Sequence, residues 1–136
     1  MAIFILKLKS FSLNNSIKFI EVPYNLENIN KYKSKDNLLR HARFIKNKTK
    51  GVFILDSKNK NLIGYCGWED GWIISLEVMK EYRGLGFGEI LLDMAIKDGC
   101  FGLTVDNKNL IAINLYKKKG FKVVNNDGRR SDMKLT

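Results

Sequence analysis

The sequence predicts an α/β (α+β) fold in which a central sheet is flanked by helices in three layers. The 136 residues are 45% apolar, which is enough for one domain, residues 1–136, with a buried core. The expected elements run as strands, two helices, a meander of strands, a helix, a strand, a helix and two strands. Amphipathic helices on both faces of a sheet produce the three layers.

Short apolar runs separated by turn residues predict the strands of the first half of the chain. These expected strands are residues 3–9, 17–22, 51–55 and 62–68. Pro23 ends the second strand. Two helices are expected next, over residues 26–32 and 36–47, with Asp36 as the N-cap of the second helix.

The second half of the chain has two expected helices, each preceded by a strand. The first helix covers about residues 86–98 and ends at Gly99, and the second ends at Gly120. Apolar residues at a helical spacing form one face of the second helix: Ile111, Ala112, Leu115 and Tyr116. The expected strands are residues 72–78, 101–105, 121–124 and 132–135.

The segment from Val78 to Glu89 is the most informative part of the chain, because it joins an expected strand to an expected helix. Gly84, Gly86 and Gly88 alternate at this junction. Glycine lacks the Cβ that would hold a ligand away from the backbone, and a helix start offers free N–H groups with a partial positive charge. The junction therefore predicts a cradle for the phosphate oxygens of a cofactor.

The spacing of these glycines distinguishes between phosphate-binding loops. The dinucleotide fingerprint requires a glycine where this chain has Glu89, and the Gly-Lys-Ser/Thr of nucleoside-triphosphate loops is absent here. Arg83, Gly86 and Gly88 instead form an Arg-x-x-Gly-x-Gly pattern. This pattern resembles the acyl-CoA pyrophosphate loop of the GNAT family, the GCN5-related N-acetyltransferases. A simple helix-capping turn would also use glycine.

A second segment resembles the later motif of the same family. It contains Asn109, the pair Ala112-Ile113, the pair Leu115-Tyr116 and the pair Gly120-Phe121. The order of the motifs and the gap between them also match the family. The resemblance covers about residues 72–125 and fades over the first 50 residues. It implies a mixed, mostly antiparallel central sheet of six or seven strands flanked by about four helices.

The resemblance also implies a function, acetyl-CoA-dependent transfer of an acetyl group to an amine. Acetyl-CoA would enter where the strands ending at Val78 and Val105 separate. The main chain at Val78 would pair with the pantetheine arm, Asn109 would hydrogen-bond to this arm, and Ala112 would let it pass. The pyrophosphate would lie against Arg83, Gly84, Leu85, Gly86, Phe87, Gly88 and Glu89. Arg83 would either touch phosphate or only anchor the loop.

The resemblance places Tyr116 in the position of the general acid, where a phenol would donate to the departing thiolate while also contacting the cofactor. The alternative role of Tyr116 is that of a core aromatic residue. Backbone N–H groups near Val78 would polarise the thioester carbonyl as the amine attacks it directly.

No general base can be assigned from the sequence. Relatives place Glu or His at positions that correspond to Trp72 and Ile74, or Glu at the position of Thr104, and none of these three side chains can take a proton. Glu77 is expected on the opposite face of its strand from Trp72 unless a β-bulge intervenes. Glu69 and Asp70 could act through water, and a water chain without a base is equally compatible with the sequence.

The net charge of +10 suits a polyanionic ligand, and coenzyme A is itself a polyanion. Basic residues concentrate between Lys31 and Lys50, where a nucleic acid could bind, although lysine could also simply cover the surface of a soluble protein. The acceptor could be a small amine, a protein amine or an aminoacyl-tRNA. The alternative to catalysis is a nucleic-acid-binding or regulatory module with the same fold, and a tRNA-directed acetyltransferase toxin is a further variant.

The remaining expectations concern metals, membranes and location. Cys66, Cys100 and the single histidine, His41, show no metal-ligand spacing, so no metal is expected. No apolar run approaches the roughly 18 residues of a membrane span, and no signal peptide is recognisable. Reduced cysteines and a cytoplasmic protein follow, and a homodimer is compatible with the sequence.

Overall fold

The computed structural model describes residues 3–7, 16–32 and 49–136. The helix expected over residues 36–47, His41 and most of the basic segment Lys31–Lys50 lie outside the described residues. The elements are β1 (Ile3–Lys7), β2 (Ser16–Pro23), α1 (Leu26–Tyr32), β3 (Lys50–Asp56), β4 (Leu62–Glu69), β5 (Trp72–Val78), the 3₁₀ helix η1 (Lys80–Tyr82), α3 (Phe87–Lys97), β6 (Gly102–Asp106), α4 (Leu110–Lys118), β7 (Phe121–Asn126) and β8 (Arg130–Leu135).

The strands form one sheet in the order β1-β2-β3-β4-β5-β6-β8-β7. Only the pair β5–β6 is parallel, and every other neighbouring pair is antiparallel. The mixed, mostly antiparallel sheet is therefore confirmed. The sheet has eight strands rather than the six or seven that the family resemblance implied, and β8 pairs with both β6 and β7 along its length.

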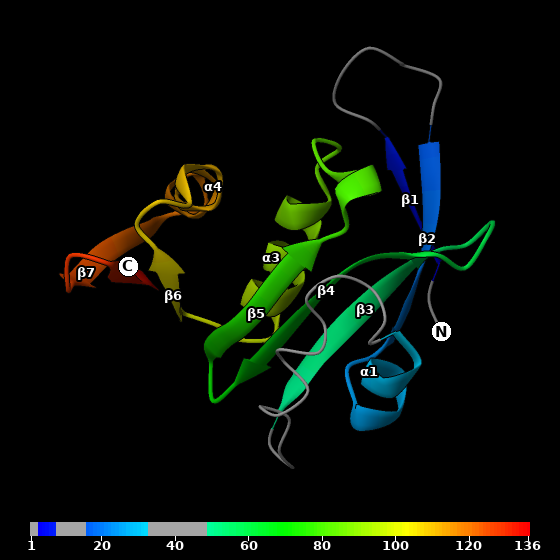
Figure 1. Cartoon of the computed structure of the whole chain (residues 1–136), viewed down its shortest axis with the longest axis horizontal. Coiled ribbons are helices and arrows are strands. Elements are labelled where there is room, and N and C mark those ends of the chain that lie inside the picture. Colours follow the sequence, from blue (N-terminus) through cyan, green and yellow to red (C-terminus); the bar gives the residue numbers. More distant parts are fainter. Residues whose placement is uncertain (1–2, 8–15, 33–48) are drawn as a thin grey trace.

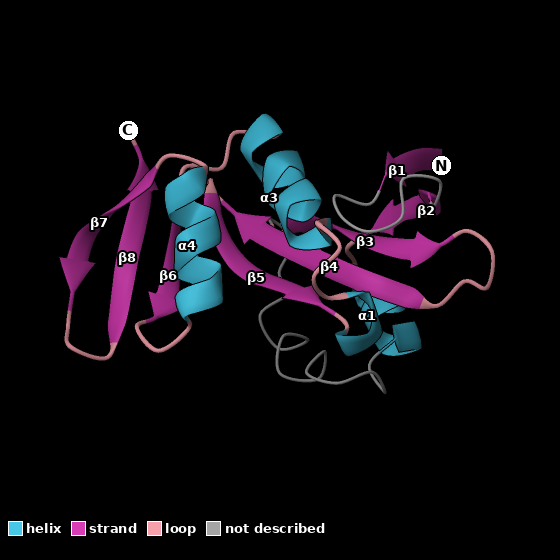
Figure 2. Cartoon of the chain, turned by 90° about the horizontal axis from the view of Figure 1, so that it is seen from above, coloured by secondary structure: helices cyan, strands magenta, loops and turns pink. Residues whose placement is uncertain are grey.

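Helices cover both faces of this sheet, as the three-layer prediction requires (Figures 1 and 2). Alternating residues of β3 divide between two apolar clusters: Val52 and Ile54 belong to the cluster under α3 and α4, and Phe53 and Leu55 to the cluster under α1. The described residues contain three α-helices, and the expected fourth lies outside them.

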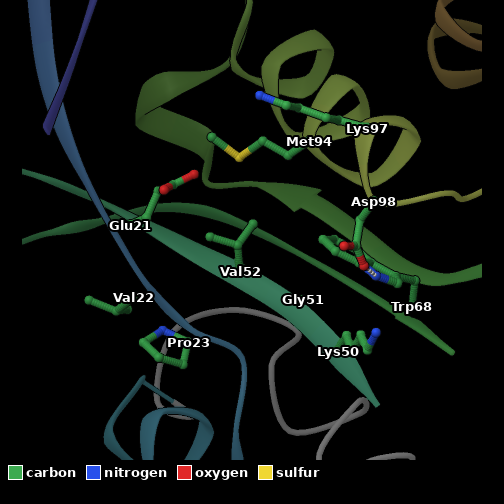
Figure 3. A pocket seen from close by; sticks show the side chains of 10 residues that line it. All are labelled: Glu21, Val22, Pro23, Lys50, Gly51, Val52, Trp68, Met94, Lys97 and Asp98. Atoms are coloured by element: carbon green, nitrogen blue, oxygen red, sulfur yellow. Dashed lines mark hydrogen bonds between the residues drawn. The ribbon is translucent and has the colours of Figure 1, made fainter. Parts of the chain in front are cut away.

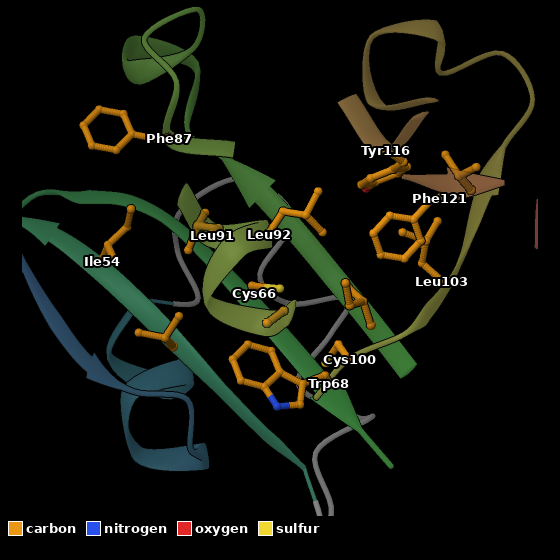
Figure 4. Packing of buried hydrophobic residues seen from close by; sticks show 14 of the residues in the cluster. Ile54, Cys66, Trp68, Phe87, Leu91, Leu92, Cys100, Leu103, Tyr116 and Phe121 are labelled. Carbon is orange, nitrogen blue, oxygen red and sulfur yellow. The ribbon is translucent and has the colours of Figure 1, made fainter. Parts of the chain in front are cut away.

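The larger core lies between the sheet, α3 and α4 (Figure 4). Leu91 and Leu92 of α3 are fully buried there, and Tyr116 of α4 packs edge-on against Phe121 with ring centroids 6.1 Å apart. Cys66 and Cys100 lie in the same core as free thiols. Their side chains are buried, which raises the pKa of both thiols.

The apolar face predicted for α4 is partly wrong. Ala112, Leu115 and Tyr116 pack against the core, and Ile113 joins them, but the side chain of Ile111 is 87% exposed. Because residues three and four apart share a helix face, the buried stripe runs through Ala112 and Tyr116, and Ile111 falls at its edge. We therefore remove Ile111 from the core-facing residues.

Candidate active site

The loop from β5 to α3 has the backbone that its glycines predicted. Gly84 has φ 77° and Gly86 has φ 93°, a left-handed region that residues with a Cβ avoid. Gly86 is the N-cap of α3, and no side chain of the described residues caps this helix start. The N–H groups of Phe87, Gly88 and Glu89 therefore belong to the first turn, where the helix provides no acceptor. This helix start can bind an anion.

Two of the loop glycines face different surroundings. A Cβ built on Gly84 would meet no atom within 4 Å, so the loop is open on that side. A Cβ built on Gly88 would meet Leu115 Cδ2 at 3.6 Å and Val78 Cγ2 at 3.9 Å, which is ordinary contact. A side chain at position 88 would therefore point toward the core, and only the backbone of Gly88 belongs to the predicted phosphate cradle.

An acidic residue in the first turn of α3 would repel phosphate, but two lysines neutralise it here. Glu89 forms ion pairs with Lys118 Nζ at 3.1 Å and with Lys119 Nζ at 3.0 Å. Lys119 also pairs with Asp93 at 3.0 Å. These contacts join the start of α3 to the end of α4, and they allow a diphosphate at the helix start.

A β-bulge lies in β5, opposite the boundary between Gly67 and Trp68. Gly67 pairs with Ser75 and Trp68 pairs with Ile73, so Ile74 is the extra residue. On its other side β5 pairs with β6 only at Trp72 and Ile73. The two parallel strands separate beyond Ile73, at the place that the family resemblance implies.

A cleft of about 210 Å³ lies where β5 and β6 separate. Asn109 and Tyr116 contribute to its wall from the segment of α4. The lining residues are Ile73, Ile74, Ser75, Leu76, Glu77, Leu103, Thr104, Val105, Asp106, Asn109 and Tyr116. Of the predicted site residues, the structure thus brings Asn109 and Tyr116 to the cleft, whereas Ala112 does not line it.

The peptide groups of β5 alternate between β4 and the cleft. Met79 N–H donates to the Ile63 carbonyl oxygen at 2.8 Å, which fixes the alternation of the antiparallel ladder. The N–H and C=O groups of Leu76 and Val78 therefore point away from β4, toward the side of the cleft. An extended amide-containing ligand could pair with these groups as an added strand would.

Arg83 lies against the end of β5. Its Nε donates a 2.9 Å hydrogen bond to the carbonyl oxygen of Val78, and its Nη2 lies 3.7 Å from Glu77 Oε1. The sequence left two roles open for Arg83, phosphate contact or loop anchor, and these contacts favour the anchor.

Asn109 is the N-cap of α4, and Tyr116 lies within the same helix. The Asn109 side-chain oxygen accepts a 3.2 Å hydrogen bond from Ala112 N–H and caps α4, because asparagine at an N-cap satisfies a free amide. The Tyr116 side chain is only 7% exposed, and its burial raises the pKa of the phenol to about 12, with a smaller effect from Cys66. Tyr116 is therefore both a core residue and a residue of the cleft wall.

The bulge also changes the position of Glu77. Ile73 packs in the α3 core, so Trp72 lies on the α1 face of the sheet. Ser75 and Glu77 lie on this same face after the extra residue, since Ser75 contacts Tyr24 at 3.2 Å and Glu77 accepts from Tyr65 Oη at 3.5 Å. The sequence could not reveal this, because a bulge depends on the partner strand.

A second polar hollow of about 330 Å³ adjoins the cleft at Thr104, on the α1 face. It is lined by Thr104, Asn125, Asp127, Arg130 and Asp132. Thr104 Oγ1 donates a 2.7 Å hydrogen bond to Asp132 Oδ1 across the β6–β8 pair. No signal in the sequence marks Asp132, because its position depends on the pairing of two residues that are 28 positions apart in the chain.

A larger hollow, of about 890 Å³, lies away from these residues (Figure 3). Its walls come from β2, β3 and α3, and Trp68 Nε1 donates to Asp98 Oδ2 at one end, at 2.8 Å. It contains no predicted site residue, so we do not place the reaction there.

Within the described ranges, no group of three or more potential ligand side chains could hold a metal ion. The expectation that the protein uses no metal stays a prediction. No helix in this part of the chain is both long and apolar enough to cross a membrane.

Comparisons with known proteins concern the family and the fold. The model of the acetyltransferase (GNAT) family matches residues 16–121. The ribosomal-protein-S18-alanine N-acetyltransferase from Escherichia coli is similar in structure, with a TM-score of 0.67 and 18% identity over 86% of this chain and 92% of that chain. PaiA N-acetyltransferase from Thermoplasma acidophilum, in complex with coenzyme A, has a TM-score of 0.62 and 16% identity over 87% and 98% of the two chains.

A third similar structure is a chimera of the spermidine N-acetyltransferase SpeG from Vibrio cholerae and hSSAT. It has a TM-score of 0.64 and 16% identity, and the match covers 86% of this chain and 94% of that one. At these identities the likeness concerns the fold. No curated protein matches the sequence.

Proposed function

The chain belongs to the GNAT family of acetyltransferases, and from this premise we propose that it is an acetyl-CoA-dependent N-acetyltransferase acting by direct attack of an amine. The observation that carries the proposal is the continuity of the site. The open glycine loop at the start of α3 is joined to β5 by the short helix η1, and β5 forms one wall of the cleft that Tyr116 also lines. A diphosphate at the loop and a thioester in the cleft suit this order.

The proposed cofactor contacts follow from the direction of each group. First-turn amides at Phe87, Gly88 and Glu89 hold the diphosphate, while Gly84, Leu85 and Gly86 shape the loop around it. Arg83 anchors the loop to β5. Val78 and Leu76 offer main-chain groups to the pantetheine amides. The Asn109 side-chain oxygen caps α4, which leaves its amide N–H₂ group as the donor toward the same arm, and Ala112 keeps the helix surface small beside it.

Acetyl-CoA supplies an activated acyl group with a thiolate as its leaving group. The main-chain N–H group of Leu76, a residue of the cleft wall, polarises the carbonyl, as a donor at a developing oxyanion does, while the Leu76 carbonyl oxygen and the Val78 groups face the pantetheine arm. Tyr116 donates to the sulfur. Because its pKa is about 12 and that of an ordinary thiol is about 8.5, full proton transfer would be uphill by roughly 5 kcal/mol. Tyr116 therefore acts mainly by donating a hydrogen bond, and solvent completes the protonation.

The acceptor is an amine of a class that stays open: a small molecule, a protein amine or an aminoacyl-tRNA. The names of the similar proteins include a ribosomal-protein alanine and spermidine, so the fold serves several acceptors. We also infer a single domain over residues 1–136, supported by one continuous sheet, and a cytoplasmic location. Most of Lys31–Lys50, on which the nucleic-acid-binding alternative rests, lies outside the described ranges.

Two experiments test the proposed function. Isothermal titration with acetyl-CoA should give saturable binding, and the absence of heat at millimolar cofactor would end the proposal. A screen of amines, peptides and charged tRNA, read by thiol release, should then identify the acceptor class. Binding without transfer to any acceptor would favour a regulatory module.

A further inference from the structure

The proposed reaction needs a group that removes a proton from the acceptor, because a protonated amine has no lone pair for attack. Trp72, Ile74 and Thr104 cannot take this proton, which leaves the carboxylates around the cleft and the hollow beside it as candidates. There are four of these in the described residues: Glu77, Asp106, Asp127 and Asp132.

Three of the four carboxylates are held in ion pairs or backbone hydrogen bonds that support the local structure. Glu77 pairs with Arg83, which anchors the phosphate loop, and also accepts from Tyr65. Asp106 Oδ1 accepts the Lys108 N–H at 2.8 Å in the turn before α4. Asp127 Oδ1 accepts the N–H groups of Arg129 and Arg130 at 2.8 and 2.7 Å. These two backbone hydrogen bonds lower the pKa of Asp127 and make it a poorer proton acceptor.

Asp132 is placed differently. Its half-buried carboxylate accepts a hydrogen bond from the neutral hydroxyl of Thr104, at 2.7 Å, and lines the hollow that meets the cleft at this same threonine. Thr104 holds one carboxylate oxygen and thereby orients the other. Because Thr104 lines both spaces, this hydrogen-bonded pair lies where the hollow meets the cleft.

The residue proposed to assist the leaving group and the candidate base lie on opposite faces of the sheet. Tyr116 lies in the core between the sheet and α4. Thr104 and Asp132 lie on the opposite face, because their strand neighbours Val105 and Met133 pack in that core. A thiolate can therefore leave toward Tyr116 while an amine approaches from the side of Asp132. The amine and the departing thiolate therefore have separate approaches to the thioester carbonyl, and a bound amine is held close to the atom that it attacks.

We propose that Asp132 is the general base of the reaction and that Thr104 is its positioning residue. The acceptor is then a protonated primary amine that enters by the hollow between β6 and β8. The proposal rests on the proposed function. The ammonium nitrogen gives a proton to the Asp132 carboxylate. Its lone pair then adds to the thioester carbonyl carbon and forms the C–N bond, and the tetrahedral intermediate collapses by breaking the C–S bond. The second nitrogen proton and the proton on Asp132 pass to solvent, and the sulfur takes one proton back.

The decisive comparison uses two acceptors that differ in their need for a base. Ethylamine is protonated at neutral pH, whereas hydroxylamine is largely neutral. Thiol release from acetyl-CoA is measured with each acceptor at saturating cofactor. We expect Asp132→Asn to lower kcat/KM roughly 100-fold with ethylamine but less than about 3-fold with hydroxylamine. Thr104→Val should give a smaller loss, about 5-fold, with the same preference.

Three controls keep the test interpretable. Affinity for CoA by titration calorimetry and the unfolding midpoint should be the same for wild type and Asp132→Asn. Glu27→Gln, on the exposed surface of α1, should leave both rates unchanged, because this carboxylate lies in neither the cleft nor the hollow. Glu77→Gln should raise the KM for acetyl-CoA without an amine-selective loss, because Glu77 holds Arg83.

Each outcome decides the question. Equal rates for Asp132→Asn and wild type with ethylamine would overturn the proposal, as would equal losses with both amines. If Glu77→Gln lowered kcat/KM much more with ethylamine than with hydroxylamine, Glu77 rather than Asp132 would be the general base. A wild-type protein that binds acetyl-CoA but acetylates neither amine, nor any acceptor in the screen, would contradict the proposed function itself.

Discussion

Arg83 Nε donates a hydrogen bond of 2.9 Å to the carbonyl oxygen of Val78. This contact ties the loop that precedes α3 to the last residue of β5. The proposed phosphate cradle is consequently connected to the strand that lines the cleft. A cofactor bound at the loop would have its reactive end placed by the same strand.

If Arg83 is an anchor, its shape matters more than its charge. We expect Arg83→Ala and Arg83→Lys to weaken CoA binding alike, roughly 10-fold, because lysine cannot reproduce the planar Nε donor. Titration calorimetry checks this. Near-normal affinity in the lysine variant, with a loss only in the alanine variant, would instead mean that Arg83 contacts phosphate.

The two glycines at the start of α3 should respond in opposite ways to alanine. Gly86→Ala forces a Cβ into φ 93° and should cost about 1–2 kcal/mol of stability while displacing the first-turn amides and weakening CoA binding. Gly88→Ala should keep CoA affinity and raise stability by about 1 kcal/mol, since alanine favours helix and its Cβ meets only ordinary contacts. Thermal unfolding and calorimetry on both variants separate these effects, and equal losses would refute the geometry of the cradle.

Replacing Tyr116 by phenylalanine should lower kcat by about 10- to 100-fold while leaving the KM for acetyl-CoA nearly unchanged. A raised pKa keeps the phenol protonated, so its donation is complete well below pH 12 and is lost only as the pH rises through about 12. The wild-type rate should therefore show no fall due to Tyr116 between about pH 7 and about pH 10. Unchanged turnover in the variant would remove Tyr116 from the mechanism.

Gly67 lies beside the bulge, where the ring of Tyr24 leaves no room for a side chain on this residue. A Cβ there would lie 2.6 Å from Tyr24 Cε1, so Gly67→Ala should cost about 1–3 kcal/mol and shift β5 at Ile74. We expect a raised KM for acetyl-CoA together with a lowered unfolding midpoint. Tyr24→Phe is the matched control: it loses only the 3.2 Å contact with Ser75, should cost about 1 kcal/mol, and should keep the KM. A normal KM in Gly67→Ala would separate the bulge from cofactor binding.

Local features of the fold could be read from the sequence because their causes are local. Helix α1 and strand β5 have the predicted bounds, and the start of α3 was marked by glycines whose positive φ only glycine adopts easily. Helix ends and turns follow from capping and breaker residues that lie within a few positions of them.

Features that depend on distant partners could not be read in this way. The extra residue at Ile74 arises from the register with Gly67 and Trp68, and it reverses the face of Glu77. Asp132 meets Thr104 only because β8 inserts between β6 and β7. The exposure of Ile111 reflects how α4 docks on the sheet, which helical periodicity alone does not determine.

The most direct test of the central claim is an amide-resolved NMR titration of the wild-type protein with CoA. We expect saturable shifts concentrated at residues 84–89 and along Leu76 and Val78, because diphosphate and pantetheine would meet these N–H groups. Shifts confined to other surfaces, such as the hollow formed by β2, β3 and α3, or no shifts at millimolar CoA, would contradict the proposed cofactor site.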